Sequence, residues 1–429
     1  MGVIIGLYTA PTPPPPTPVP PTVTTTTLSS IKSLSAIGGG NVTSDGGATV
    51  TARGICWSTS QNPTIADSTT SNGTGTGTFS SSMRVLDPSV TYYVRAYATN
   101  SAGTSYGAQQ TVTTRAFRVM KINKFDTKVN VPSAVNDILS TINTHGFNWI
   151  QLYDLNTILA SNTLTTSMAT FISKSRAIGV ERVGAIRSLS KTKWNDVFNY
   201  NTAHPWYEQF DDFNIENEFW WWPLSTNNPL SPNYGNGTSF PDSQPFSTWE
   251  ASGSWLKTTL DGAPYNRGNA YIAAGGNPWI ISAYINNYSS GYGQWDYYAG
   301  TNDQATGSAL ANIVDVWEAT NYNSNAPDAA RLGVGGVRPQ LQYLASGAFD
   351  LGITRSFVPL YSLEEIAWGA ETDLSGYYFQ GIGLPQGETT WDNTYNPSVL
   401  SAIPHRNNIK LIGHNYFAYT YVTKSVGII

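Results

Sequence analysis

The sequence predicts a two-domain protein in which an all-β sandwich precedes an α/β domain, a (β/α)8 barrel with eight parallel strands. The first observation is length, because 429 residues exceed the roughly 100–200 that one ordinary domain uses. The second is that short alternating strand patterns fill residues 22–114. The third is that apolar strand patterns alternate with helical stretches over residues 115–429, which is typical of βα units.

The N-terminal segment, residues 1–21, differs from both domains in composition. Residues 11–21 read PTPPPPTPVPP, a run that favours polyproline II and acts as a semi-rigid spacer. The stretch before it, MGVIIGLYTA, lacks the basic residues of a secretory signal and is too short to span a bilayer. We expect this segment to pack against another subunit, in a homo-oligomer or a larger assembly.

Composition excludes several classes of function. Charged residues make up 12% of the chain and the formal net charge is −5, which argues against nucleic acid as a partner. Cys56 is the one cysteine, so no internal disulfide forms, and the four histidines have no metal-ligand spacing. We therefore predict no metal and no cofactor. No stretch has 18 uninterrupted apolar residues, so we predict no membrane span.

The abundance of aromatic residues indicates a different class of partner. They make up 13% of the chain, with 14 Trp and 25 Tyr. Flat aromatic faces stack on the C–H bonds of sugar rings, although most such residues belong to protein cores. Asn, Thr, Ser, Gly and Tyr also outnumber Lys and Glu, which is typical of surface and virion proteins. The composition thus predicts an extracellular, cell-surface or virion location.

The segment 22–114 carries strand signals at short spacing, including ATVTARGICWST, GTFSSSMRVL and TYYVRAYATN. Its run LDP at residues 86–88, followed by TYYVRA at 91–96 and NSAG at 100–103, resembles the F strand and FG turn of fibronectin type III domains. The resemblance implies that Tyr92 is the tyrosine-corner residue, whose hydroxyl bonds back to the backbone. In this family such modules are spacers or binding modules.

The segment 115–429 contains eight apolar runs that predict parallel strands. They cover residues 117–125, 147–155, 181–188, 210–220, 269–277, 312–321, 354–361 and 408–421. Helical patterns between them include VPSAVNDILSTINTHG and TTSMATFISKSRAIG. The stretches 222–245 and 366–400 are rich in Pro, Asn and Gly, so we expect long loops at the carboxyl ends of strands, where binding residues gather.

The fourth predicted strand, FDDFNIENEFW at residues 210–220, carries the candidate chemistry. Side chains alternate along a strand, so its aromatic and aliphatic residues should face the helices. Asp212, Asn214, Glu216 and Glu218 share the opposite face and should point into the barrel. Acids crowded there repel each other, which raises the pKa of one of them. A raised pKa suits a general acid near neutral pH.

This strand resembles the D-x-x-D-x-D-x-E motif of glycoside hydrolase family 18, the chitinases and endo-β-N-acetylglucosaminidases, whose fold is the TIM barrel. Here it reads Asp211-x-x-Asn214-x-Glu216-x-Glu218, with Asn214 and Glu216 in place of the family's two inner aspartates. The resemblance implies substrate-assisted retention on an N-acetylated glycan, in which the substrate's acetamido oxygen attacks the anomeric carbon. Glu218 would protonate the glycosidic oxygen, Glu216 would orient the acetamide, and Asn214 would hydrogen-bond Glu216.

A second interpretation uses a pair of carboxylates. Many retaining barrel glycosidases place Asn-Glu after strand four and a nucleophilic Glu after strand seven. Asn217-Glu218 with Glu364 or Glu365 matches those positions. We rank it lower, because both glutamates lie several residues beyond the predicted end of strand seven.

Further residues lie at predicted strand ends and are candidates for substrate binding: Asp212, Tyr153, Trp220, Trp279, Asp315, Glu318 and Tyr322. A competing hypothesis needs no catalysis. The altered motif and the proline-rich N-terminus also suit a structural or adhesive subunit of a virion or cell-surface appendage, with a degenerate glycosidase barrel.

Overall fold

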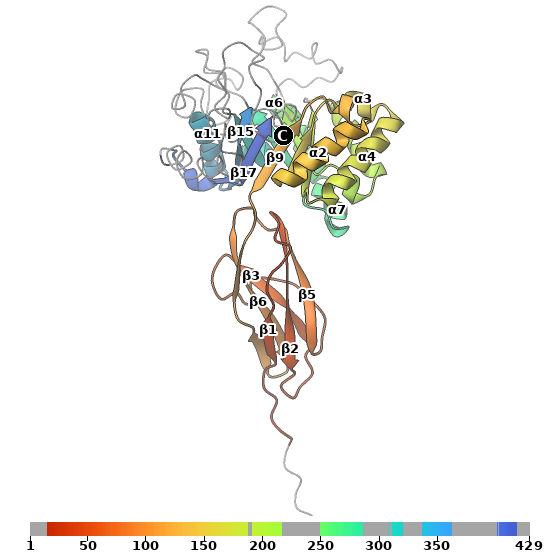
Figure 1. The fold of residues 1–429 in the computed structure, drawn as a ribbon. Coiled ribbons are helices and arrows are strands. Elements are labelled where there is room, and N and C mark those ends of the chain that lie inside the picture. The colour runs from red at the N-terminus through yellow and green to blue at the C-terminus, as the bar shows by residue number, and fades with distance from the viewer. Residues whose placement is uncertain are drawn as a thin grey trace, which may run out of the picture. The chain divides into compact units, whose positions relative to one another are not determined.

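The structure is a computed structural model, and it describes residues 15–187, 191–216, 249–285, 308, 311–320, 337–362, 401 and 403–417. The chain divides into two compact units, Met1–Arg115 and Ala116–Ile429, each with its own hydrophobic core. From Pro15 onward the regular elements of the first unit are all strands, and the second unit contains both strands and helices (Figure 1).

The first unit is a β-sandwich of two antiparallel sheets. One sheet has the order β1-β2-β5, from β1 (Thr22–Thr25), β2 (Ser35–Ser44) and β5 (Gly77–Arg84). The other has the order β4-β3-β6-β7, with β8 paired to β6, from β3 (Ala52–Ser58), β4 (Ser68–Thr69), β6 (Thr91–Asn100), β7 (Gly103–Tyr106) and β8 (Gln110–Thr113). Alternating apolar side chains of both sheets, such as Val42, Ile55 and Val94, fill the core.

The predicted tyrosine corner is confirmed. The hydroxyl of Tyr92, at the start of β6, accepts a hydrogen bond of 3.0 Å from the backbone N–H of Asp87. This bond ties the strand to the turn before it. On β3, burial raises the pKa of the Cys56 thiol to about 11, so this cysteine is a protonated core residue and not a nucleophile.

The second unit is built on a nearly closed barrel of parallel strands. In chain order they are β9 (Phe117–Ile122), β10 (Trp149–Leu152), β11 (Arg182–Arg187), β12 (Asp212–Glu216), β13 (Ile280–Ile285), β14 (Val316–Thr320), β15 (Arg355–Ser362), β16 (Ile409–Leu411) and β17 (Gly413–Phe417). Pairing follows the order β14-β13-β12-β11-β10-β9-β17-β15-β16, and β14 also pairs with β15. The predicted eighth strand is divided at Ile412 into β16 and β17, which gives nine described strands instead of eight.

Helices occupy the described connections between these strands. They are α1 (Phe125–Lys128), α2 (Pro132–His145), α3 (Leu155–Leu159), α4 (Asn162–Ala177), α5 (Lys191–Ala203), α6 (Trp249–Asp261), α7 (Asn269–Ala273) and α11 (Val337–Asp350). In Figure 1, α2 and α4 lie on the outside of the strands. Their ends follow from sequence, because Pro132 begins α2, Gly146 ends it with φ 65°, and Ser161 caps α4.

Two predicted strands are misplaced in the sequence analysis. Residues 269–277 are not the fifth strand, because residues 269–273 form α7 and the strand is β13 at Ile280–Ile285. A short apolar run does not distinguish a helical turn from a strand, and Gly275-Gly276 ends the helix. The predicted sixth strand, 312–321, begins in a helical segment at 311–313, and β14 starts at Val316.

Candidate functional site

The inside of the barrel holds a connected group of wholly buried polar side chains, here called the interior network. Its members are Lys121, Gln151, Asp212, Asn214, Ser282, Glu318 and Asn415. They come from β9, β10, β12, β13, β14 and β17, so six strands contribute. Branched apolar residues normally fill a parallel barrel, and buried polar groups there are costly unless they are hydrogen-bonded.

Asp212 is the most heavily hydrogen-bonded carboxyl of the interior network. Its Oδ2 accepts bonds from Trp149 Nε1 at 2.9 Å and from Gln151 Nε2 at 3.0 Å, and its Oδ1 accepts from Ser282 Oγ at 2.6 Å. Burial raises the pKa of Asp212 to about 7, against the opposing effect of the bonds from Ser282 and Gln151. The Asp212 carboxyl is therefore expected to titrate near neutral pH.

Asn214, two residues further along β12, has a fixed amide orientation. Its Nδ2 donates to Ser282 Oγ at 2.7 Å and to Glu318 Oε1 at 2.8 Å. Its Oδ1 is buried and accepts no hydrogen bond from the residues that the structure describes. Because both donor positions are used, the carbonyl oxygen is the part of this side chain that is left for another donor.

Lys121 and Glu318 form the one ion pair with both side chains wholly buried in the part of the chain that the structure describes. The distance from Lys121 Nζ to Glu318 Oε2 is 2.5 Å. Lys121 Nζ also lies 5.8 Å from the centre of the Tyr153 ring, and Glu318 Oε1 accepts a bond from Gln151. A buried charge is tolerated only when it is paired in this way.

Strand alternation explains which side chains enter the barrel. Phe213 and Ile215 of β12 lie in the outer core, by which we mean the apolar layer between the barrel strands and the helices. There Phe213 packs against Trp194 and Phe198 of α5, at 5.8 and 5.5 Å between ring centres. Asp212 and Asn214 lie on the other face, as the sequence predicts.

Neighbouring β11 makes room for the Asp212 carboxyl at Gly184. A Cβ there would overlap Oδ2 of Asp212 and lie 2.9 Å from Cγ of Gln151. The glycine is therefore required by this close approach and not by its backbone conformation.

Asp211, the first residue of the motif, faces away from the interior network. Its carboxylate lies 3.3 Å from Arg176 Nη2, accepts a bond of 3.1 Å from the Tyr271 hydroxyl and receives the backbone N–H of Val183 at 2.7 Å. These contacts join β12 to α4, α7 and β11. Asp211 is thus a structural residue of the outer core.

Several predicted site residues fall outside the described part of the chain. Glu216 is the last residue of β12, and its side chain is not described. The other residues outside are Glu218, Trp220, Tyr322, Glu364 and Glu365. Tyr153 directly follows β10 and is half-buried beside Lys121. Glu318 lies inside the barrel on β14.

Trp279 and Asp315 do not lie where the sequence analysis places them. Trp279 precedes β13 and is buried in the outer core, with its ring 5.3 Å from that of Phe213. Asp315 precedes β14, where its Oδ2 lies 2.6 Å from Arg267 Nη1 and accepts the Ile281 N–H at 2.9 Å. Both are at the amino ends of their strands, because the fifth and sixth strands begin later than predicted.

Four members of the interior network were not predicted from the sequence: Lys121, Gln151, Ser282 and Asn415. Each is a polar residue at an inward position of its strand. Gln151, for example, lies between Ile150 and Leu152 of the outer core. Strand alternation could have shown that these side chains face inward. A single polar residue in a strand does not, however, show which residue of another strand it bonds to.

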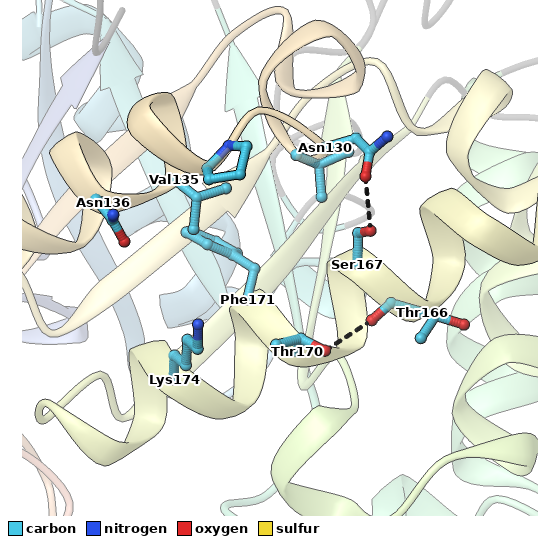
Figure 2. Close-up of a pocket in the computed structure, with 10 residues that line it drawn as sticks. Asn130, Val135, Asn136, Thr166, Ser167, Thr170, Phe171 and Lys174 are labelled. Atoms are coloured by element: carbon cyan, nitrogen blue, oxygen red, sulfur yellow. Dashed lines mark hydrogen bonds between the residues drawn. The ribbon is translucent and has the colours of Figure 1, made fainter.

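Two surface hollows are described, and neither contains the interior network. The first, of about 250 Å³, lies between α2 and α4 (Figure 2). There Ser167 donates to Asn130 at 3.3 Å, and Lys174 is the single charged side chain of the lining. The second, of about 520 Å³, lies on the sandwich beside Trp57 and Asp67. Without a paired acid and base, neither is a candidate catalytic centre.

The described residues show neither a metal-binding cluster nor a membrane-spanning helix. They contain no group of three or more His, Cys, Asp or Glu side chains arranged to hold a metal ion. None of the helices described there is long and apolar enough to cross a membrane.

The comparisons with known proteins found matches among solved structures. No protein-family model and no curated protein matches the chain. Among solved structures, the sensor domain of the anti-sigma factor RsgI4 of Pseudobacteroides cellulosolvens matches at 23% identity and TM-score 0.19, over 23% of this chain and 97% of that one. The human KIAA0970 fibronectin type III domain matches at 12% identity and TM-score 0.18, over 22% of this chain and 72% of that one.

Proposed function

We propose that the chain is a glycan-directed extracellular, cell-surface or virion protein whose barrel hydrolyses N-acetylglucosamine-containing glycans with retention. The observation that supports it is the orientation of β12. Asp212 and Asn214 of this strand enter the buried interior network, and Glu216 and Glu218 follow at the same parity. In barrel enzymes the carboxyl ends of the strands carry the reacting groups.

The proposed architecture is a fibronectin type III-like module followed by a (β/α)8 barrel. The tyrosine corner and the two antiparallel sheets support the first part. Parallel pairing around the barrel, including β14 with β15 and β17 with β9, supports the second. We keep the segment 1–21 as the proposed contact to another subunit.

The proposed chemistry is substrate-assisted. Glu218 protonates the leaving glycosidic oxygen while the acetamido oxygen of the substrate attacks the anomeric carbon. The bond to the leaving sugar breaks as the bond to the acetamido oxygen forms, and water then opens the oxazolinium ring with Glu218 as base. Glu216 orients the acetamide and balances the oxazolinium charge. Asp212 and Asn214, which precede these glutamates in the sequence, hold β12 in place by their buried hydrogen bonds.

The test is product release from N-acetylglucosamine oligomers and N-glycans by the wild type, Glu218→Gln and the exposed control Asp137→Asn. We expect turnover in the wild type and the control, and a loss of about 100-fold or more in Glu218→Gln, because general acid catalysis contributes about 10²–10⁴-fold. Full activity of Glu218→Gln would exclude Glu218 as the acid. An inactive wild type that still binds glycan would replace the hydrolase with the non-catalytic adhesive subunit.

A second candidate mechanism uses a carboxylate beyond β15. This strand is described as far as Ser362, and Glu364 and Glu365 follow it in the sequence. A nucleophilic Glu364 or Glu365 would form a covalent glycosyl intermediate and would not need the acetamido group. Turnover of glucose oligomers, lost in Glu364→Gln or Glu365→Gln, would support this pair. Strict dependence on the 2-acetamido group would support substrate assistance.

A further inference from the structure

The amide of Asn214 is oriented by residues outside its own strand. Its Nδ2 lies 2.8 Å from Glu318 Oε1 on β14 and 2.7 Å from Ser282 Oγ on β13. A flipped amide would place the carbonyl oxygen against a carboxylate oxygen, which is repulsive. The carboxylate therefore selects one of the two amide orientations.

The ion pair keeps this carboxylate in place. Lys121 Nζ lies 2.5 Å from Glu318 Oε2, the oxygen that does not face Asn214. Glu318 Oε1 accepts hydrogen bonds from both Asn214 and Gln151, so the two carboxylate oxygens have separate partners. Oε1 is thus held by two hydrogen bonds and Oε2 by the attraction of the Lys121 ammonium, which keeps Oε1 directed at Asn214.

We infer that Glu318, held by Lys121, is a positioning residue that fixes Asn214 of β12 with its carbonyl oxygen as the available acceptor. Asn214 Oδ1 is wholly buried and accepts no bond from the described residues. A fixed acceptor binds only a donor, such as a protonated carboxyl or the hydroxyl or acetamido N–H of a sugar. The inference rests on the proposed function, and it makes Glu318 the residue that decides whether Asn214 offers an acceptor or a donor.

This assignment explains the asparagine in the motif. An ionised Asp at position 214 would place a second negative charge against Glu318 Oε1 inside the barrel, where like charges repel strongly. The neutral amide donates to Glu318 and leaves the Lys121–Glu318 pair electrically balanced. The carboxylate beside position 214 is thus supplied by Glu318 of β14, while residue 214 of β12 is neutral.

Two charge-neutral double variants separate positioning from stability. Lys121→Met with Glu318→Gln removes both charges but keeps an oxygen acceptor at position 318. Lys121→Met with Glu318→Leu removes both charges and the acceptor. Replacing a buried pair by uncharged residues avoids the destabilisation, about 3–5 kcal/mol, of leaving one charge unpaired. Urea unfolding verifies that both doubles are folded.

We expect the Gln double to retain most of the wild-type kcat. The Leu double should lose about 100-fold in kcat with little change in KM, the size of effect that a misplacement of about 1 Å produces. A purely structural pair would give equal kcat values in the two doubles, and that result would overturn the inference.

A measurement without turnover keeps the inference testable if the proposed function fails. The side-chain amide protons of Asn214, assigned by NMR with an Asn214→Ser variant, should exchange slowly in the wild type and in the Gln double, and faster in the Leu double. Equal exchange in both doubles would overturn the positioning role. An inactive wild type with the expected exchange pattern would reject the hydrolase and leave the role of Glu318 standing.

Discussion

Asp212 combines complete burial with three hydrogen-bond donors. Trp149, Gln151 and Ser282 donate to its two oxygens, yet the loss of hydration dominates and raises the pKa to about 7. The nearby Glu318 carboxylate raises it further. Protonation of Asp212 thus relieves negative charge inside the barrel.

The raised pKa predicts how stability depends on pH. The folded protein retains the Asp212 proton up to about pH 7, whereas the unfolded chain releases it near the ordinary aspartate pKa of 3.8. Between these values the folded state binds more protons, so this group lowers the free energy of unfolding as the pH rises from about 4 to 7. Its contribution, of the order of a few kcal/mol, is fully present below pH 3.8 and lost above pH 7.

Urea unfolding of the wild type and Asp212→Asn at several pH values checks the predicted pH dependence of the free energy of unfolding. The variant carries no titrating group at position 212, so its stability should fall less over the same interval. The exposed Asp137→Asn serves as the matched control and should follow the wild type. Parallel curves for the wild type and Asp212→Asn would contradict the assignment.

At the scale of elements, β11 and β12 fit together because β11 has a glycine opposite the Asp212 carboxyl of β12. Gly184 pairs with Asp212 in the parallel register, and a Cβ at Gly184 would overlap the Asp212 carboxyl. Strand alternation decides that position 184 faces inward, and the neighbouring strand decides that it must be small.

Gly184→Ala should therefore destabilise the protein by about 1–3 kcal/mol, the usual effect of overpacking a core. The penalty should shrink when Asp212 is shortened to Ala, because the two sites compete for the same space. A double-mutant cycle by urea unfolding measures this coupling. Additive effects of the two substitutions would show that Gly184 is not constrained by Asp212.

At the scale of the whole molecule, the two compact units have separate cores. The sandwich core includes Ile55, Val94 and Tyr92, whereas the barrel core includes Phe171, Phe198 and others outside the strands. Units with separate cores unfold as separate cooperative transitions.

Calorimetry of the intact protein should therefore show two transitions that respond to different substitutions. Tyr92→Phe removes the acceptor for the Asp87 N–H and should cost about 1 kcal/mol, which lowers one Tm by about 4–8 °C. Gly184→Ala should lower the other Tm. A single transition that shifts with both variants would contradict independent unfolding.

The sequence alone determined the class of each segment and the parity of the fourth barrel strand. Alternation and turn residues are local signals, so the sandwich, Tyr92 and the inward face of Asp212 and Asn214 follow from them. The boundaries of the fifth and sixth strands did not follow, because the short apolar runs near Trp279 and Asp315 fit a helical turn as well as a strand.

Only the tertiary structure decided which polar residues belong together. Lys121 and Glu318 are far apart in the chain, and no spacing rule links a lysine on β9 to a glutamate on β14. Their pairing depends on the arrangement of the strands around the barrel, which brings polar residues of six strands to one interior where buried polar groups need hydrogen-bond partners. The sequence therefore determined which side chains of the fourth barrel strand face inward, and the barrel geometry decided which residues of the other strands meet them.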